Sequence, residues 1–219
     1  MYFSRTGRFN WMVGCLLVAL VGCTTPTHQS QQVEPDSSSL TLTQPVAATK
    51  AAATVTEIRQ PPVFIRPPNT SQEAPAQVGT PLAIGGRIRT GQKALAQVNL
   101  ANGLAFRLSE NSVLTLQPDQ RLNLEAGDMI TWVQPGKKIP TEIVTPIGVA
   151  GIRGTTVFVK IPTDLSEGIL FFAWEGTVSV RLPGQTEEIL LKTAEEVRIR
   201  PGDRDINQIR QRVRRLPRS

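Results

Sequence analysis

The chain has 219 residues, of which 40% are hydrophobic and 19% are charged, a composition that can supply one folded core. Its formal net charge is +6, but five arginines lie within residues 210–219, so the excess is local and does not indicate a nucleic-acid-binding surface. The cysteines are Cys15 and Cys23 and the single histidine is His28, which excludes Cys/His metal sites and Ser/His or Cys/His catalysis in the remainder of the chain.

Residues 1–22 have the three parts of an export signal. Arg5 and Arg8 form a positive region, residues 11–21 an uncharged apolar region, and the small Gly22 precedes a cleavage point. Residues 20–23, Leu-Val-Gly-Cys, are typical of a bacterial lipobox, which predicts a lipoprotein signal peptide and lipid attachment at Cys23. The alternative is an ordinary secretory signal that contains a cysteine by chance.

Lipid attachment at Cys23 would anchor the protein without a transmembrane helix. The apolar region is shorter than the about 20 residues that a spanning helix needs, whereas each buried methylene of an acyl chain contributes about 0.8 kcal/mol. Thr24 rather than Asp follows the cysteine, as in lipoproteins sent to the outer membrane. We therefore expect the protein on the periplasmic face of the cell envelope, in the outer membrane if two membranes are present.

Residues 23–76 are rich in Thr, Ser, Gln, Ala and Pro and have no sustained apolar periodicity. Such a segment buries too little apolar surface to offset its ordering entropy, which predicts a lipidated, disordered linker. The apolar triplet at residues 63–65 is interpreted as a chance feature of this linker.

Residues 77–203 are predicted to form a single all-β domain of about ten to twelve short strands, as a β-sandwich or a stacked β-solenoid. Apolar residues alternate with polar or small ones, which places them on one face of a sheet. Turn-forming dipeptides separate the runs, and Asn102-Gly103 is the clearest hairpin signal. The alternating groups include Leu114 and Leu116, Leu122 and Leu124, Val157, Val159 and Ile161, and Leu170, Phe172 and Trp174.

Residues 204–219 change to a helical spacing of apolar residues at 206, 209, 213 and 216, which predicts a short, basic amphipathic helix capped by Asp203 or Asp205. The helix would close the domain with its apolar side. Its arginines are either solvated or contact an anionic surface of the envelope. The arginines in question are Arg210, Arg212, Arg214 and Arg215.

Five motifs in this order resemble the FecR domain family, from about residue 84 to 202. The strongest is residues 144–157, Val-Thr-Pro-Ile-Gly-Val-Ala-Gly-Ile-Arg-Gly-Thr-Thr-Val, which is similar to the family's Thr-Pro…Arg-Gly-Thr segment. The others are at residues 86–91, 98–103, 173–178 and 195–197. The motif residues, interpreted mainly as structural, are Thr145, Pro146, Gly148, Arg153, Gly154, Thr155, Glu175 and Gly176. An anion could bind to Arg153, but we expect it to pair with Glu175 or Glu142.

The resemblance implies an extracytoplasmic binding role. Well-known FecR proteins span the membrane and control a sigma factor, but the lipobox stands where their cytoplasmic part would be. We therefore expect a non-catalytic binding or sensory accessory module that contacts an envelope protein or cell-wall component, with no cofactor and no nucleic acid or small-molecule substrate. The alternative is a structural lipoprotein that binds peptidoglycan or surface polysaccharide. Neighbouring carboxylates such as Glu187 and Glu188 point to opposite faces of a strand and do not indicate an enzyme.

Overall fold

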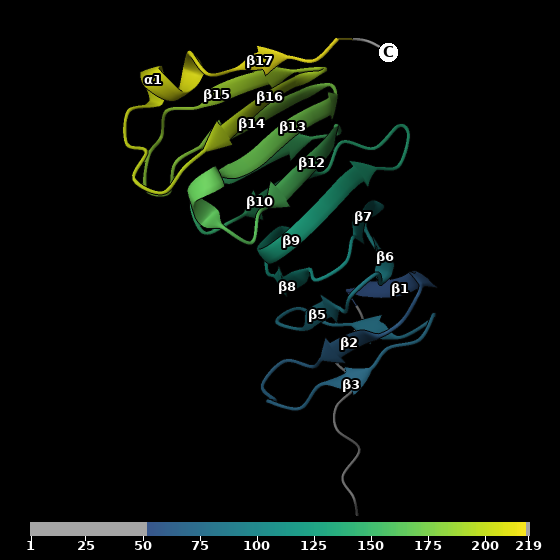
Figure 1. Cartoon of the computed structure of the whole chain (residues 1–219). Helices are drawn as coiled ribbons and strands as arrows, with labels where there is room; N and C mark the ends of the chain where they lie inside the picture. The colour runs from purple at the N-terminus through teal and green to yellow at the C-terminus, as the bar shows by residue number, and fades with distance from the viewer. Residues whose placement is uncertain (1–51, 218–219) are drawn as a thin grey trace, which may run out of the picture. The chain divides into compact units, whose positions relative to one another are not determined.

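The computed structural model describes residues 52–217, which belong to one compact unit. The prediction of an all-β fold is confirmed: strands follow one another from β1 to β17, with one short helix, α1 (Ile206–Arg210), and one 3-10 turn, η1 (Leu165–Glu167). The strands form two layers, here sheet A and sheet B, which share the long strand β9 (Arg121–Val133) (Figure 1).

The order of strands in each sheet follows from their backbone pairing. In sheet A the neighbours are, in turn, β4 (Pro81–Leu82), β1 (Ala53–Arg59), β6 (Leu95–Leu100), β7 (Leu104–Leu108), β9, β12 (Thr156–Ile161), β13 (Ile169–Glu175), β16 (Glu195–Ile199) and β17 (Arg214–Arg215). In sheet B they are β3 (Ala74–Pro75), β2 (Val63–Arg66), β5 (Arg87–Thr90), β8 (Val113–Gln117), β9, β10 (Pro140–Val144), β11 (Val149–Arg153), β14 (Thr177–Arg181) and β15 (Ile189–Lys192). Among the described strands, only β9 and β10 pair in parallel.

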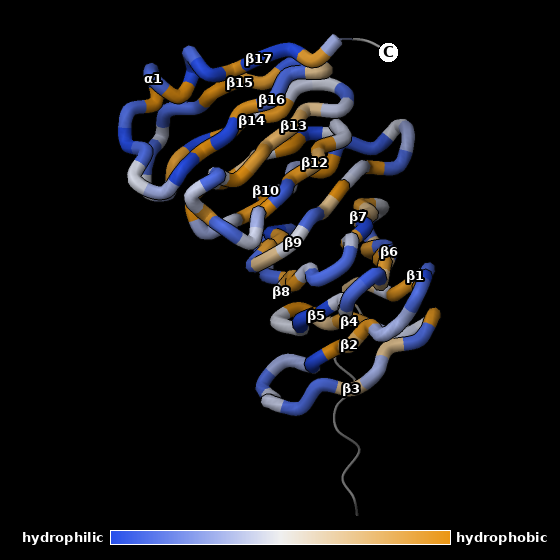
Figure 2. The backbone as a smooth tube through the Cα atoms, in the orientation of Figure 1, coloured by the Kyte–Doolittle hydropathy of each residue, from blue (hydrophilic) through white to orange (hydrophobic). Residues whose placement is uncertain are grey.

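One apolar core lies between the two sheets. Alternate residues of the strands point into it, so that Val157 and Val159 of β12 are fully buried while Lys160 is exposed. Apolar residues follow the strands along the chain (Figure 2). Gly148, next to β11 of sheet B, lies so close to Phe171 of sheet A that a Cβ atom would come 2.9 Å from the ring. The strands therefore pack as two facing layers, an arrangement common to both predicted alternatives, the β-sandwich and the stacked β-solenoid.

Strand β9 passes from one layer to the other at Gly127. Its residues up to Ala126 pair with β8 in sheet B, and those from Gly127 onward pair with β12 and β7 in sheet A. Gly127 has φ +78°, and a Cβ atom there would lie 2.5 Å from Cα of the fully buried Ser112. Only glycine fits both conditions, so this residue determines where the strand changes layer.

The predicted disordered linker is wrong for residues 52–76, because these residues form β1, β2 and β3. Val55 and Val63 are 0% and 1% exposed and belong to the core, and the triplet at 63–65 is part of strand β2. Short runs that bury little surface by themselves become stable when they extend two existing sheets, β1 beside β6 and β2 beside β5. These added strands, with the two-residue strands β3, β4 and β17, explain why the structure has more strands than predicted.

The segment around β3 is held by a charged side chain. Glu73 forms an ion pair with Arg89 of β5 at 2.6 Å, and the Arg89 guanidinium lies 4.4 Å from the centre of the Phe64 ring. The hydrogen bond from Arg89 lowers the pKa of the Glu73 carboxyl below its ordinary value. The ion pair is therefore complete at neutral pH and is lost as the pH falls through the lowered pKa.

The predicted C-terminal helix is correct only for its first turns. Asp205 caps α1 by accepting hydrogen bonds from the backbone N–H groups of Asn207 and Gln208, and Ile206 and Ile209 are buried. The helix ends at Arg210, and the chain then extends as β17 along the edge of β16. The helical spacing of the later apolar residues was misleading, because pairing with β16 satisfies backbone groups that a longer exposed helix would satisfy internally.

Candidate functional site

The Thr145–Gly148 turn joins β10 to β11. It contains the first residues of the strongest family motif, and their hydrogen bonds hold the turn. The buried Thr145 hydroxyl donates a hydrogen bond of 2.6 Å to the Gly148 carbonyl and accepts one of 3.1 Å from the Gly148 N–H. Pro146 and Ile147 lie between them in the turn. The Thr145 side chain closes the turn from inside the protein, so this part of the motif has no free group to offer a ligand.

The Arg153-Gly154-Thr155 motif passes from sheet B to sheet A, and the Glu175-Gly176 motif passes back beside it. Gly154 and Gly176 have φ +80° and +82°, and a Cβ atom on Gly176 would clash with the Thr155 methyl group. The Gly176 N–H also donates to the Thr193 hydroxyl of the next crossing, at 3.0 Å. The two motifs thus fit into one another, which explains why threonine and glycine occur together there.

Arg153 does not form the predicted ion pair. Glu142 instead pairs with Arg181 at 2.6 Å and with Arg121 at 3.1 Å, and within residues 52–217 Arg153 pairs with neither Glu142 nor Glu175. Its exposed side chain borders a shallow trough of about 560 Å³ that Gly151 also lines. The prediction failed because Arg121 lies on β9, which pairs with β10, and Arg181 lies on β14, which pairs with β11. Sequence spacing does not reveal that these strands bring both arginines to Glu142.

The four tail arginines all have partners within the domain. Arg214 pairs with Glu196 at 2.5 Å, Arg215 with Glu195 at 3.0 Å and Arg212 with Asp203 at 2.7 Å. Arg210 donates to the Asn207 side chain at 2.6 Å and to the Glu188 carbonyl at 3.2 Å. Glu195 and Glu196 are therefore pairing partners for β17.

We expect Arg214 and Arg215 to differ in their contribution to stability. The Glu196 side chain is 7% exposed, so Arg214→Gln leaves a buried carboxylate without its cation and should cost about 1–2 kcal/mol of unfolding free energy. The Glu195 side chain is 19% exposed and its partner Arg215 is 60% exposed, so Arg215→Gln should cost less than about 0.5 kcal/mol. Urea unfolding of both variants measures the difference, and equal losses would contradict the assignment.

The outer side of sheet A carries a group of large apolar side chains on neighbouring strands, here called the aromatic face. Along β13, the residues of this face alternate with the buried Phe171 and Ala173, which point into the core. Trp174 is 60% exposed and its ring meets that of Phe172 edge to face, with centroids 5.8 Å apart. The aromatic face consists of Ile130, Trp132, Phe158, Phe172 and Trp174.

Charged residues border the aromatic face on both sides. Directly paired positions run across the strands from Arg107 on β7 through Ile130, Phe158 and Phe172 to Glu196 on β16 and Arg214 on β17. The Arg107 guanidinium also lies 6.0 Å from the centre of the Trp132 ring. An apolar centre with a charged border is the composition of a protein-binding surface.

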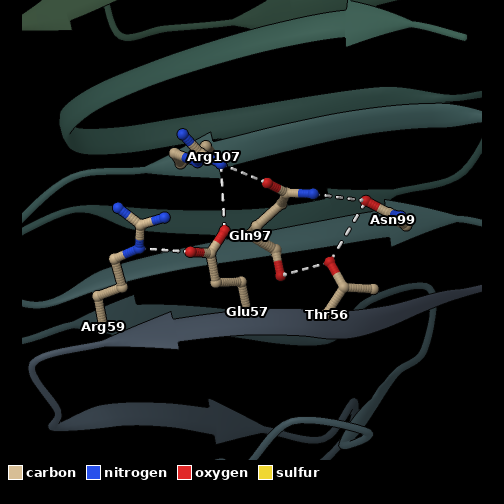
Figure 3. Close-up of polar contacts among 6 residues, drawn as sticks. All are labelled: Thr56, Glu57, Arg59, Gln97, Asn99 and Arg107. Atoms are coloured by element: carbon tan, nitrogen blue, oxygen red, sulfur yellow. Dashed lines mark hydrogen bonds and ion pairs between the residues drawn. The ribbon is translucent and has the colours of Figure 1, made fainter.

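Polar side chains beyond Arg107 hold that border in place. Arg107 donates to Glu57 at 3.2 Å and to the Gln97 side chain at 2.7 Å, while Gln97 in turn donates to Asn99 (Figure 3). Glu57 also pairs with Arg59. Because Glu57 belongs to β1, a strand within the predicted linker fixes the orientation of Arg107 beside the aromatic face.

Periodicity in the sequence indicates the aromatic face only in part. Leu170, Phe172 and Trp174 were predicted to share one side of a strand, which is correct. In residues 169–174 every residue is apolar, however, so periodicity does not distinguish the inner from the outer side. Tryptophan in such a run is a weak indication of the outer side, since its size makes complete burial rare.

Cys23 lies outside the described residues, so its role stays a prediction. Within residues 52–217 there is no helix long and apolar enough to cross a membrane. In the same part of the chain, no group of three or more His, Cys, Asp or Glu side chains is arranged to hold a metal ion.

Two solved structures resemble part of this chain. Both are crystal structures of a Parabacteroides distasonis protein proposed to be an anti-sigma factor, with 19% identity and a TM-score of 0.45. The aligned part covers 54% of this chain and 57% or 56% of those chains, so it spans little more than half their length. No curated protein has significant sequence similarity to the chain.

The fold and its surfaces define the class of protein as an all-β module whose distinguishing outer feature is an aromatic face. Residues 86–179 match the family model described as FecR protein. The resemblance in the motifs is thereby confirmed for these residues.

Proposed function

We propose that this protein is a lipid-anchored, non-catalytic sensory module of the cell envelope that binds a protein partner through the aromatic face. The FecR domain at residues 86–179 supports the sensory role, because this family is regulatory rather than enzymatic. The observation that carries the choice of surface is Trp174, whose side chain is 60% exposed although its ring packs against that of Phe172.

The chemistry of the aromatic face supports a protein partner. Tryptophan and arginine are the residues that most often dominate binding energy, and they do so where an apolar centre is surrounded by groups that exclude water. Trp174 and Phe172 would provide the centre, and Arg107 and Arg214 the border. Since sheet A holds these side chains on paired strands, little further ordering is needed when a partner binds.

The proposed location rests on the lipobox. Cleavage after Gly22 and acylation of Cys23 would place the domain at the periplasmic face of the envelope. In the wild type we expect incorporation of labelled palmitate and recovery with the outer membrane where two membranes exist. Cys23→Ser should abolish both, and an unlabelled wild-type protein would remove the basis for the anchor.

Site-specific cross-linking in intact cells tests the surface. A photoreactive amino acid is placed at position 174 or, as a matched control, at position 190, since Leu190 is 61% exposed on the outer side of sheet B. We expect one defined protein adduct from position 174 and none of the same mass from position 190. After the partner is identified, purified Trp174→Ala should bind it at least about tenfold more weakly than wild type, whereas Leu190→Ala should not.

Two results would contradict the proposal. Identical adducts from both positions would mean that the aromatic face has no special role. Unchanged protein binding by Trp174→Ala, together with reduced co-sedimentation with purified cell wall, would favour the structural lipoprotein that binds peptidoglycan or polysaccharide. Both substitutions are at exposed positions and should leave the melting temperature within a few degrees of wild type.

A further inference from the structure

A small cleft beside strand β16 is lined mainly by arginine. It has a volume of about 200 Å³ and lies between β16 and the segment that follows α1. The lining residues are Glu196, Val197, Arg198, Arg200, Arg212 and Arg214. Four arginines and one glutamate therefore line the cleft, and like charges so close together repel one another.

The acidic residues near the cleft are already engaged. Glu196 pairs with Arg214 at 2.5 Å, and Asp203 pairs with Arg212 at 2.7 Å while accepting a 2.8 Å hydrogen bond from the Arg200 N–H. Within residues 52–217, neither Arg198 nor Arg200 forms an ion pair through its side chain. The four arginines carry four positive charges and Glu196 and Asp203 carry two negative charges. The cleft therefore has an excess of two positive charges.

Arg198 and Arg200 are placed to act together. They are two residues apart at the end of β16, and both lie beside Gly168: the Arg198 side chain approaches the Gly168 carbonyl at 3.5 Å, and a Cβ atom on Gly168 would lie 2.9 Å from Cγ of Arg200. Arg212, on the other side of the cleft, is fixed by Asp203. Arg198 and Arg200, which have no ion pair among residues 52–217, thus line the same cleft as the ion-paired Arg212, and several arginines together can supply the donors that an anion needs.

We propose that this cleft binds a phosphate group. A phosphate carries about two negative charges and three acceptor oxygens at neutral pH, which matches the excess of two positive charges and the several N–H donors. A carboxylate has one charge and two oxygens and would neutralise only half of the excess. The volume is below the roughly 300 Å³ of pockets that enclose a whole small molecule, so the cleft suits a single phosphate group, either free or as the terminal monoester phosphate of a lipid headgroup.

This site differs from the anionic-surface contact predicted for the tail. Of the four arginines in that prediction, only Arg212 and Arg214 line the cleft, and each is held by a carboxylate. The free charges belong to β16 and the residue after it, outside the tail. The cleft shares Glu196 and Arg214 with the border of the aromatic face, but Arg198 and Arg200, which the test changes, lie outside that face and its border.

Titration of the full chain in detergent micelles tests the cleft. The probes are inorganic phosphate and a short-chain phosphatidic acid, whose phosphate is a monoester, each followed by isothermal titration calorimetry at low ionic strength. We expect the wild type to bind at least one of them and the double variant Arg198→Gln, Arg200→Gln to bind at least about tenfold more weakly. Arg153→Gln is the matched control, because Arg153 is also exposed and without an ion pair among residues 52–217, and it should bind like wild type.

The outcomes separate the sources of the phosphate. Binding of the lipid alone identifies a headgroup, and binding of inorganic phosphate, with or without the lipid, shows that the free ion is sufficient. No binding of either probe at millimolar concentration overturns the proposal, as does an equal loss in the double variant and in Arg153→Gln, which would indicate only general attraction by positive charge. Added salt should weaken binding by the wild type, since the cleft is open to solvent.

Discussion

Replacing Gly127 with alanine should destabilise the protein more than any other single-methyl addition that we predict. The residue has φ +78°, which costs a residue with a Cβ atom about 1–2 kcal/mol. The new methyl group would also lie 2.5 Å from Cα of Ser112, a backbone atom that cannot rotate away, and such overpacking costs about 1–3 kcal/mol more. The expected loss in free energy of unfolding is therefore about 2–5 kcal/mol, measured by denaturant titration.

Gly136→Ala is the matched control for this prediction. Gly136 has φ +81°, but no atom lies within 4 Å of the position that its Cβ would occupy. This variant should lose only the conformational part, about 1–2 kcal/mol. Equal losses at the two positions would mean that β9 can shift away from Ser112 without cost. The passage of β9 between the layers would then not depend on the close contact between Gly127 and Ser112.

A chain that begins at residue 77 should fail to fold, although residues 23–76 have the composition of a linker. The deletion removes β1 and β2, whose residues Val55, Val63 and Ile65 are 0%, 1% and 6% exposed in the core. Each such side chain contributes about 1.5–3 kcal/mol on burial, and a domain has a total stability of only about 5–15 kcal/mol. The burial free energy lost with these three side chains is thus comparable to the total stability of the domain.

A chain that begins at residue 52 is the appropriate control, because it retains every described strand. It should show a cooperative thermal transition followed by circular dichroism, whereas the chain from residue 77 should show none and should aggregate through the newly exposed edges of β5 and β6. A sharp transition at the same temperature in both chains would show that the first strands are dispensable.

Periodicity predicted most strands of the domain because one side of each strand is buried. The pairs Leu114 and Leu116, and Leu122 and Leu124, are buried to within 1% exposure and lie opposite one another across β8 and β9. The same rule could not detect β1, where a register shift between Val55 and Glu57 interrupts the alternation. It also could not specify which side of β13 faces the core, since both sides are apolar.

The candidate surfaces were harder to predict than the strands. Two of the motif residues make local contacts of the kind expected for a structural role: the Thr145 hydroxyl closes its turn, and Gly176 lies against the Thr155 methyl group. Ion pairs between strands distant in sequence could not be foreseen, and Arg153 was therefore assigned a partner that Arg121 and Arg181 already occupy. The aromatic face and the arginine cleft both result from cross-strand neighbours, which depend on strand order as much as on residue type.

The shared strand β9 has a consequence for how the domain comes apart. Its first half is paired on both sides in sheet B, by β8 and β10, and its second half on both sides in sheet A, by β7 and β12. Neither sheet can separate at its middle without breaking backbone hydrogen bonds of β9. Fraying at the outer strands β3, β4, β15 and β17 is therefore local, whereas the centre exchanges its amide protons only when the two layers separate together, as one cooperative unit.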